Sequence, residues 1–291
     1  MKIVRFLGGL GNQMFQYAFY KSLELQFKNV KADILEFENY THHNGFELEK
    51  IFPLRINHAS RFEINFIDFR NRAWKYRKLR RLLFFKGGYY EEWPFFSYED
   101  SIFRDHSSKI YWGYWQHHDY VDKVGDQLRK DFVFPALDPS PNLELLKELG
   151  QEEKSVAIHV RRGDYLKDPY LGGLVNLAYF ENGISYMKER LAHPRFYVFS
   201  DDMAWCKENL PLGNDAIFVD WNIGNESYRD MQLISQCKHA IISNSTFSWW
   251  GAWLNQHPEK LVVVPKLWWR HPDIKVDTSQ MHPTAWITIE G

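Results

Sequence analysis

Hydrophobic and polar positions alternate most regularly in the C-terminal half of the chain. Apolar runs short enough for strands occupy 155–160, 196–200, 216–219, 239–243 and 261–265. Runs compatible with helices lie between them, at 178–192, 202–210, 226–237 and 246–256. Short buried strands that alternate with helices predict a parallel sheet covered by helices on both faces.

The N-terminal end predicts a second unit of the same kind. Residues 2–7 are apolar and β-branched, and they run into a glycine cluster at 8–11. A helix-compatible run follows at 12–28, and a short strand candidate follows at 32–35. A strand, a tight loop, a helix and a strand in this order open a Rossmann-type unit.

The segment between these two regular parts has weaker periodicity. It is rich in aromatic and charged side chains, and helices are expected around 60–84 and 120–130. Three prolines at 135–141 then precede a short polar helix, which is typical of a domain junction. We therefore predict two domains, 1–148 and 149–291.

Composition and charge exclude several functional classes. The formal net charge is -1 and the pI is near 6.9, so nothing indicates a nucleic-acid partner. Cys206 and Cys237 cannot build a disulfide framework and match no zinc pattern, which fits a reducing compartment. The N-terminus does not resemble a signal peptide, and no stretch approaches the roughly 20 apolar residues that span a bilayer. We expect a soluble, cytoplasmic protein.

One local cluster of charge departs from this balance. Segment 70–81 contains seven arginine and lysine side chains. Such a run is most often a solvated helix face. The alternative is peripheral contact with the anionic inner membrane or with a lipid-linked acceptor.

The glycine loop GGLGNQMFQYA at 8–18 separates the first predicted strand from the first predicted helix. Glycines let a phosphate approach the backbone, and the helix N-terminus behind them offers N–H groups and a positive dipole end. As a dinucleotide fingerprint the loop is incomplete, because Met14 stands where a third Gly or Ala belongs. Asp33 does lie where a ribose-binding acid is expected. A binding loop and a purely structural turn both fit.

The motif HVRRGDY at 159–165 follows a predicted strand. His159, Arg161 and Arg162 arrive at the carboxyl end of that strand, where open α/β sheets bind ligands. Arginine suits paired hydrogen bonds to diphosphate oxygens. Adjacent arginines point to different sides, so one can face a ligand while the other braces the loop. The alternative is a surface arginine pair with Asp164 as its partner.

Two further motifs also follow predicted strands. In FSDD at 199–202, a carboxylate could accept from N1–H and the amino group of guanine, cap the next helix, or bind a metal. The adjacent spacing of Asp201 and Asp202 disfavours the metal. In ISNSTFSWWGAWL at 242–254, residues 243–246 supply cap groups at a helix N-terminus, which is a second anion-binding position. The tryptophans of this motif are expected to pack the helix onto the sheet.

All four motifs fall on strand-to-helix loops, and together they suit a nucleotide diphosphate that carries a further group. Neither a nucleophile elbow with its triad nor an H-E-x-x-H motif is present. Two other function classes compete. A nicotinamide oxidoreductase would use 8–33 as its dinucleotide site but would leave Arg161 and Arg162 without a role. A non-catalytic carbohydrate-binding protein built on the tryptophans would bind sugar without a nucleotide.

These motifs resemble the α-1,2-fucosyltransferase family, glycosyltransferase family 11, in its bacterial form. The similar stretches are GGLGNQMFQYA, NGFELEKIF at 44–52, GYWQ at 113–116, HVRRGDY, FSDD and SNSTFSWWGAWL. The resemblance implies an α/β fold of the GT-B kind, with two Rossmann-like domains that face each other across a cleft. The C-terminal domain would bind the donor, and the N-terminal domain would carry the acceptor side.

The resemblance also implies an activity. It is the inverting, metal-independent transfer of L-fucose from GDP-β-L-fucose to the 2-hydroxyl of a terminal galactose, with no cofactor. The acceptor would be a galactose-terminated glycan, free or lipid-linked, in O-antigen or capsule assembly.

Site residues follow from the same resemblance. Arg161 would hold the β-phosphate and stabilise the departing GDP, and Asp202 would read guanine. Asp164 is the first candidate for the base that takes the acceptor proton. Asp168, His42 and His43 are the alternatives, although a loose, cation-like transition state would need little help from a base. Donor contacts would come from Gly11, Asn12, Gln13, His159, Arg161, Arg162, Asp201, Asp202, Ser245, Thr246 and Phe247. The acceptor side would be lined by Tyr114, Trp115 and Gln116.

Overall fold

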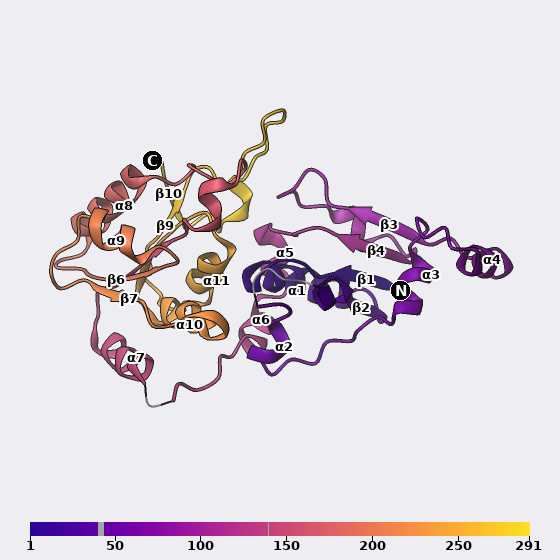
Figure 1. Cartoon of the computed structure of the whole chain (residues 1–291), viewed down its shortest axis with the longest axis horizontal. Helices are drawn as coiled ribbons and strands as arrows, with labels where there is room; N and C mark the ends of the chain where they lie inside the picture. The colour runs from indigo at the N-terminus through magenta and orange to yellow at the C-terminus, as the bar shows by residue number, and fades with distance from the viewer. Residues whose placement is uncertain (40–43, 139) are drawn as a thin grey trace. The chain divides into compact units, whose positions relative to one another are not determined.

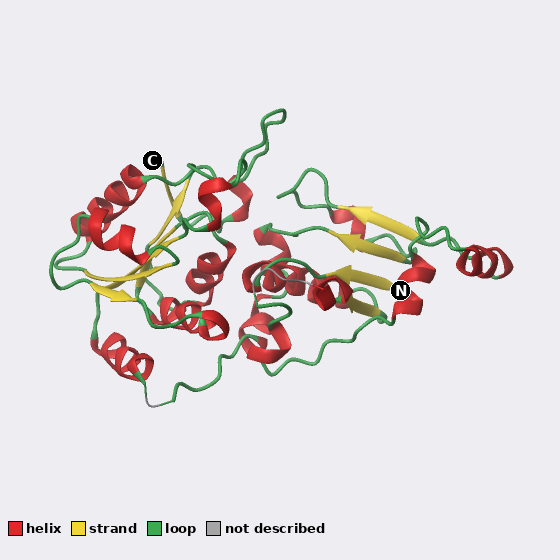
Figure 2. Ribbon diagram, in the orientation of Figure 1, coloured by secondary structure: helices red, strands yellow, loops and turns green. Residues whose placement is uncertain are grey.

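Two compact units, Met1–Val133 and Phe134–Gly291, make up the chain. The computed structural model describes residues 1–39, 44–138 and 140–291. Each unit contains its own parallel sheet with helices around it (Figures 1 and 2). The division precedes the 148/149 boundary expected from the sequence, because helix α7 (Pro141–Gln151) packs against α10 (Tyr228–Gln236) of the second unit.

Unit 1 is built on a four-stranded sheet with the order β2-β1-β4-β3, in which every neighbouring pair is parallel. Its strands are β1 (Lys2–Arg5), β2 (Val30–Asp33), β3 (Gly88–Glu91) and β4 (Lys109–Trp112). Its helices are α1 (Leu10–Glu24), α2 (Leu48–Ile51), α3 (Arg61–Ile67), α4 (Trp74–Leu82), α5 (His118–Asp122) and α6 (Gly125–Asp131). Because β1 and β4 are parallel neighbours in this sheet, the loops that follow them leave the same edge side by side.

The single helical region expected at 60–84 is two helices, α3 and α4. Ser60 begins α3 through a reciprocal capping box with Glu63. Asp68 ends it, because its side chain accepts from the backbone N–H of Arg70 at 2.9 Å and favours a turn over a further helical residue. Strands β3 and β4 were not expected, since GYYE and KIYW lack a clear apolar and polar alternation.

Unit 2 confirms the alternating pattern of the C-terminal half. Its six-stranded parallel sheet has the order β10-β9-β8-β5-β6-β7. The strands are β5 (Ser155–Val160), β6 (Arg195–Ser200), β7 (Ile217–Val219), β8 (His239–Ile242), β9 (Val262–Pro265) and β10 (Ile287–Ile289). Counted along the chain from β5, this is the 3-2-1-4-5-6 order of Rossmann folds. Only β10 was absent from the expected strands.

Helices cover both faces of the second sheet. They are α7, α8 (Leu177–Arg190), α9 (Met203–Asn209), α10 and α11 (Thr246–Leu254). Val156, Ile158 and Val160 of β5 form one core with side chains of α8 and α9. His159 points to the opposite face, where its ring lies 5.6 Å from that of Phe247 on α11. The alternation along β5 therefore decides which side chains reach α11.

Tryptophans of α11 lie in the core, as the sequence predicted. Trp249 and Trp250 are fully buried, and Trp253 is nearly so. Their rings pack edge to face with centroids 5.0 and 5.3 Å apart. Within the part of the chain that the structure describes, no helix has the length and apolar character needed to cross a membrane.

Close packing of α10 on α11 depends on Gly251. A Cβ atom there would lie 2.6 Å from Cγ2 of Ile234. We expect Gly251→Ala to lower the free energy of unfolding by about 1–3 kcal/mol, since overpacking forces neighbours apart. Gly150→Ala in α7 is the matched control, because nothing lies within 4 Å of its added methyl group. That control should be neutral or stabilising by up to about 1 kcal/mol. Urea unfolding of both variants makes the comparison, and equal effects would contradict it.

Candidate active site

Two of the predicted motifs meet where the strand order of the second sheet reverses, between β5 and β8. The backbone N–H of Ser243 donates to the carbonyl of His159 at 3.1 Å, and Nδ1 of His159 lies 3.2 Å from Oγ of Ser243. The HVRRGDY loop and the start of α11 are thus joined at the carboxyl edge of the sheet. This is the edge at which open α/β sheets bind ligands.

A network of arginines and carboxylates occupies this edge. Arg161 pairs with Asp164 through Nη2 at 2.9 Å and with Asp201 through Nε at 3.2 Å. Arg162 donates from Nε to Asp202 at 3.1 Å and from its backbone N–H to Asp201 at 2.9 Å. The FSDD and HVRRGDY motifs therefore form one charged cluster. The pairing of an arginine with Asp164, one of the two readings of the sequence, is present.

Asp202 also begins helix α9. Its Oδ1 accepts from the backbone N–H of Trp205 at 3.3 Å, so the capping role considered for it is confirmed. Gly163 lets the loop pass close to Asp201, because a Cβ atom there would lie 2.7 Å from Oδ2 of that residue. Recognition of guanine by Asp202 stays a prediction.

His159 is a neutral, buried member of the site. Burial lowers its pKa to about 3, and the charge of Arg161 acts in the same direction. A ring with so low a pKa is a weak base near pH 7. His159 therefore orients the loop through Ser243 and packs beside Phe247.

The N-terminus of α11 faces the same edge. Ser245 is its capping residue, in extended conformation and almost fully buried, and the first turn holds no acidic side chain. Thr246 and Phe247 follow at intermediate exposure. The first N–H groups of a helix lack partners within the helix and attract anions. Asn244, expected to be a cap group, instead donates to the carbonyls of Leu171 and Trp268 at 3.3 and 3.2 Å and ties two loops together.

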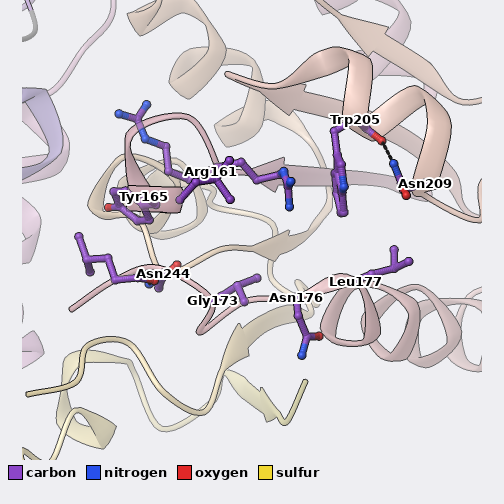
Figure 3. Close-up of a pocket in the computed structure, with 12 residues that line it drawn as sticks. Arg161, Tyr165, Gly173, Asn176, Leu177, Trp205, Asn209 and Asn244 are labelled. Carbon is purple, nitrogen blue, oxygen red and sulfur yellow. Dashed lines mark hydrogen bonds between the residues drawn. The ribbon is translucent and has the colours of Figure 1, made fainter. Parts of the chain in front are cut away.

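A cavity of about 300 Å³ opens beside this cluster in unit 2. Figure 3 shows Arg161 and Tyr165 on one side of it and Trp205 and Asn209 on the other. The guanidinium carbon of Arg162 lies 4.1 Å from the centre of the Trp205 ring, which is a cation–π contact. No role was predicted for Trp205 or Tyr165 from the sequence. The signal for Trp205 was its place one helical turn after Asp202.

The glycine loop and GYWQ meet in unit 1, where they follow the neighbouring parallel strands β1 and β4. Oδ1 of Asn12 accepts from Nε2 of Gln116 at 2.8 Å. Gln16 bridges the two loops, accepting from the N–H of Leu7 at 3.0 Å and donating to the carbonyl of Gly113 at 3.2 Å. Gly8 has φ +77°, and a Cβ atom there would lie 2.5 Å from the amide of Asn12. The loop is therefore a close backbone turn that places Gly11 and Asn12 beside GYWQ.

Two residues predicted to contact substrates are buried and make contacts within unit 1. Gln13 is fully buried, and its amide donates to the carbonyls of Gly8 and Gly45 and accepts from the N–H of Glu47, all within 2.9 Å. Trp115 is 1% exposed and stacks on Phe19 with centroids 3.8 Å apart. Both side chains fix the loops in place. Tyr114 and Gln116 stay the predicted acceptor-side residues.

The acid expected for a dinucleotide ribose is already engaged. Asp33 is 1% exposed and pairs with Nε of Arg5, on the neighbouring strand, at 2.8 Å. Its other oxygen accepts from the N–H of Leu35 at 3.1 Å. Asp33 was the main residue that supported the nicotinamide interpretation, and this pairing occupies it.

Glu92, which follows β3, is a buried carboxylate that sequence reasoning missed. Its Oε2 accepts from the backbone N–H groups of Tyr114 and Trp115 at 2.6 and 2.8 Å. Burial raises its pKa to about 7, against the opposing effect of these hydrogen bonds. Trp115 has φ +57°, a left-handed conformation that is rare for a bulky residue, so Glu92 holds a strained loop. Nothing in the sequence distinguishes it from the exposed Glu91 beside it.

Candidates for a base and for metal ligands are spread over both units. Asp168 accepts from the N–H groups of Tyr170 and Leu171 at 2.7 and 2.9 Å, which gives it a turn-forming role. His42 and His43 lie outside the described residues. Among the residues that are described, one trio could present metal ligands within 4.8 Å of one another, namely His117, His118 and Asp119. These follow one another at the start of α5 and do not include the FSDD acids.

Comparison with known sequences gives a consistent result. The family model of glycosyl transferase family 11 matches residues 1–290. The chain is 32% identical to an alpha-1,2-colitosyltransferase of Escherichia coli, over 99% of this chain and 98% of that one. It is 28% identical to the O-antigen biosynthesis glycosyltransferase WbnK of the same species, over 97% and 98%. A galactoside 2-alpha-L-fucosyltransferase of Bos taurus is 35% identical over 34% of this chain and 28% of that one.

Among solved structures, the chain is similar to the α-1,6-fucosyltransferase NodZ soaked with GDP-fucose. The TM-score is 0.52 at 14% identity, over 87% of this chain and 92% of that one. At this identity the likeness concerns the fold alone. It agrees with the expected α/β fold of the GT-B kind.

Titration of Glu92 predicts a pH-dependent difference in stability. The folded state keeps a proton that the unfolded chain, with its ordinary glutamate pKa, has released. The free energy of unfolding of the native protein should therefore fall relative to Glu92→Gln as pH rises from about 4.5 past 7. The difference is on the order of 3 kcal/mol. Urea unfolding of both proteins at several pH values measures it.

Glu91→Gln is the control for this measurement, because Glu91 is exposed. Its stability should follow that of the native protein at every pH. If the difference in free energy of unfolding between the native protein and Glu92→Gln does not change with pH, Glu92 is ionised over the whole pH range measured.

Proposed function

The chain belongs to glycosyl transferase family 11, and we propose that it transfers L-fucose from GDP-β-L-fucose to the 2-hydroxyl of a terminal galactose, with inversion and without a metal. One observation carries the proposal. Arg161 stands at the carboxyl edge of β5, at the same strand-order reversal as the N-terminus of α11. A guanidinium and a helix N-terminus that share one edge suit a diphosphate.

Donor binding in this proposal is an exchange of partners. Arg161 is held by Asp164 and Asp201, and Asp164 is about half exposed. A diphosphate would replace Asp164 as the counter-charge of Arg161, so the arginine would pass from one anion to another without losing its pairing. Trp205 and Asn209 on the far wall of the cavity would then face the remainder of the nucleotide.

Chemistry in this proposal is a single displacement. The 2-oxygen of galactose bonds to C1 of fucose as the bond from C1 to the β-phosphate oxygen breaks, so a β donor gives an α product. Arg161 and the α11 N-terminus stabilise the charge that develops on departing GDP. Asp164, released from Arg161 by the diphosphate, would accept the proton of the acceptor hydroxyl. No step calls for a metal.

The similar proteins support a bacterial glycan role and also favour a second candidate donor. One relative is named as an O-antigen biosynthesis glycosyltransferase, and we propose the same class of product here. The relative named as an alpha-1,2-colitosyltransferase makes a colitosyl donor the alternative. Colitose is L-fucose without its 3-hydroxyl, so the two donors would share their nucleotide contacts and differ at one sugar position.

A transfer assay with defined donors tests the proposal. The protein is incubated with lactose and either GDP-fucose or GDP-colitose, in the presence of excess EDTA, and the product linkage is determined. We expect an α-1,2-fucosylated galactose and a higher kcat/KM for GDP-fucose. Preference for GDP-colitose would replace the donor. Loss of activity in EDTA that a divalent metal restores would refute the metal-free mechanism.

Removal of the phosphate-binding arginine should affect chemistry and leave the fold intact. We expect Arg161→Ala to lower kcat by about 10²- to 10³-fold, as loss of one charge-stabilising donor does elsewhere. Arg195→Ala is the control, because Arg195 pairs with Glu148 at 2.9 Å at the start of β6. Steady-state kinetics and a thermal melt compare them.

Asp164→Asn separates the two roles of that carboxylate. A base would be needed in the chemical step, so kcat should fall while the KM for donor changes little. A carboxylate that only pairs with Arg161 would instead alter the KM for donor.

Near-native turnover of Arg161→Ala would exclude the role of Arg161 in phosphate binding.

A further inference from the structure

Helix α4 lies at the end of the unit 1 sheet where the strands begin, opposite the loops that follow β1 and β4 (Figure 1). The chain after α4 leads directly into the start of β3. The surface formed by α4 and residues 83–86 is therefore remote from the GYWQ loop. Whatever it does is separate from the substrate contacts proposed above.

Its inner side is firmly anchored. Tyr76 is buried against unit 1, and Phe85 stacks on Phe66 with centroids 4.5 Å apart. The guanidinium of Arg80 donates to backbone carbonyls on α3 and in the loop after it, including that of Asp68 at 2.9 Å. A Cβ atom at Gly87 would collide with the carbonyl of Ile67, so this glycine lets the chain pass close to α3. The segment is thus held in a defined position.

Its outer side presents large apolar side chains to solvent. Trp74 is 73% exposed and Leu82 is 72% exposed, on the side of α4 away from Tyr76. Phe84 is 95% exposed at φ +49°, a conformation that few bulky residues adopt. Leu83 beside it is also exposed. A constrained backbone that points a phenylalanine outward is not explained by packing within the unit.

The same surface carries cations without acidic partners. Arg70 pairs with Asp68 and Arg80 binds carbonyls, so these two have structural roles. The other six basic side chains are exposed and form no ion pair among the residues that the structure describes: Arg72, Lys75, Arg77, Lys78, Arg81 and Lys86. No aspartate or glutamate occurs between 69 and 90. We call the exposed residues among 72–86 the α4 face.

We propose that the α4 face docks on an anionic phospholipid bilayer, with Trp74, Leu82, Leu83 and Phe84 entering the interface and the six cations binding headgroup phosphates. Aromatic and aliphatic tips mixed with lysine and arginine suit the boundary between headgroups and acyl chains. A hollow lined by Phe69, Phe84, Arg77, Arg81 and Lys86, among others, has the same mixed character.

Other occupants fit this surface less well. A second copy that met it through a two-fold axis would place six cations against six, which repel each other. A nucleic acid would be attracted by the cations but would leave Leu82 and Leu83 in water, and the net charge of −1 gives no broad basic field. Of these three occupants, the bilayer alone uses both the charged and the apolar side chains.

Vesicle sedimentation of the full chain, without nucleotide or acceptor, tests the proposal. The native protein should bind vesicles that are roughly one-third phosphatidylglycerol and should not bind pure phosphatidylcholine, with binding that weakens as salt rises. The variant Lys75→Gln/Lys78→Gln/Arg81→Gln should bind about a hundredfold more weakly, at roughly fivefold per charge. The control Lys130→Gln/Lys147→Gln/Lys188→Gln removes three exposed charges elsewhere and should bind as the native protein does.

A second variant isolates the apolar contribution. Trp74→Ser/Phe84→Ser keeps every charge, so it should retain weak binding that moderate salt abolishes. Both side chains are exposed, and transfer to lactose should be unchanged in all these variants, which separates this proposal from the proposed function. Absence of binding to anionic vesicles, equal loss in the control, or self-association that Trp74→Ser/Phe84→Ser removes without any lipid binding would overturn it.

Discussion

The reversal of strand order between β5 and β8 is the constraint on which the rest of the site depends. Crossovers from these two strands leave the sheet in opposite directions, so their carboxyl ends have an open edge between them. Hydrogen bonds between His159 and Ser243 join the ends of the two strands at this edge. Because β5 and β8 are adjacent, the arginines after β5 lie beside the start of the helix after β8, although more than eighty residues separate them in sequence.

Charge at this edge is compensated within the protein. Arg161 pairs with Asp201, which is fixed by the backbone N–H of Arg162, and Arg162 pairs with Asp202, which caps α9. A partly buried cation left alone would bear a large desolvation penalty. Keeping it paired holds its guanidinium in position, and an arriving diphosphate then has only to displace one exposed carboxylate. The arrangement favours preorganisation over maximal electrostatic attraction.

The sequence predicted those parts of the structure in which local pattern and tertiary role coincide. The strands β5, β6 and β8 are short apolar runs, so the motifs that follow them could be placed at one edge of a sheet from the sequence alone. β3 and β4 were not predicted, because aromatic side chains occupy both of their faces. The contacts of Gln13 and Trp115 within unit 1 were not predicted, because their partners, Gly45, Glu47 and Phe19, are known only from the tertiary structure. Glu92 was not predicted, because the burial that raises its pKa cannot be recognised from the sequence.

The two units repeat one plan with different chemistry. In unit 2 the carboxyl edge of the sheet carries guanidinium groups and carboxylates, and in unit 1 it carries the amides of Asn12 and Gln116. Neutral amides both donate and accept, which suits the hydroxyl groups of sugars, whereas guanidinium groups only donate, which suits phosphates. Glu92 lies beneath the unit 1 loop and accepts from its backbone N–H groups, so it adds rigidity to that loop. In the proposed transfer, the guanidinium groups of unit 2 would bind the diphosphate of the donor, and the amides of unit 1 would bind hydroxyl groups of the acceptor glycan.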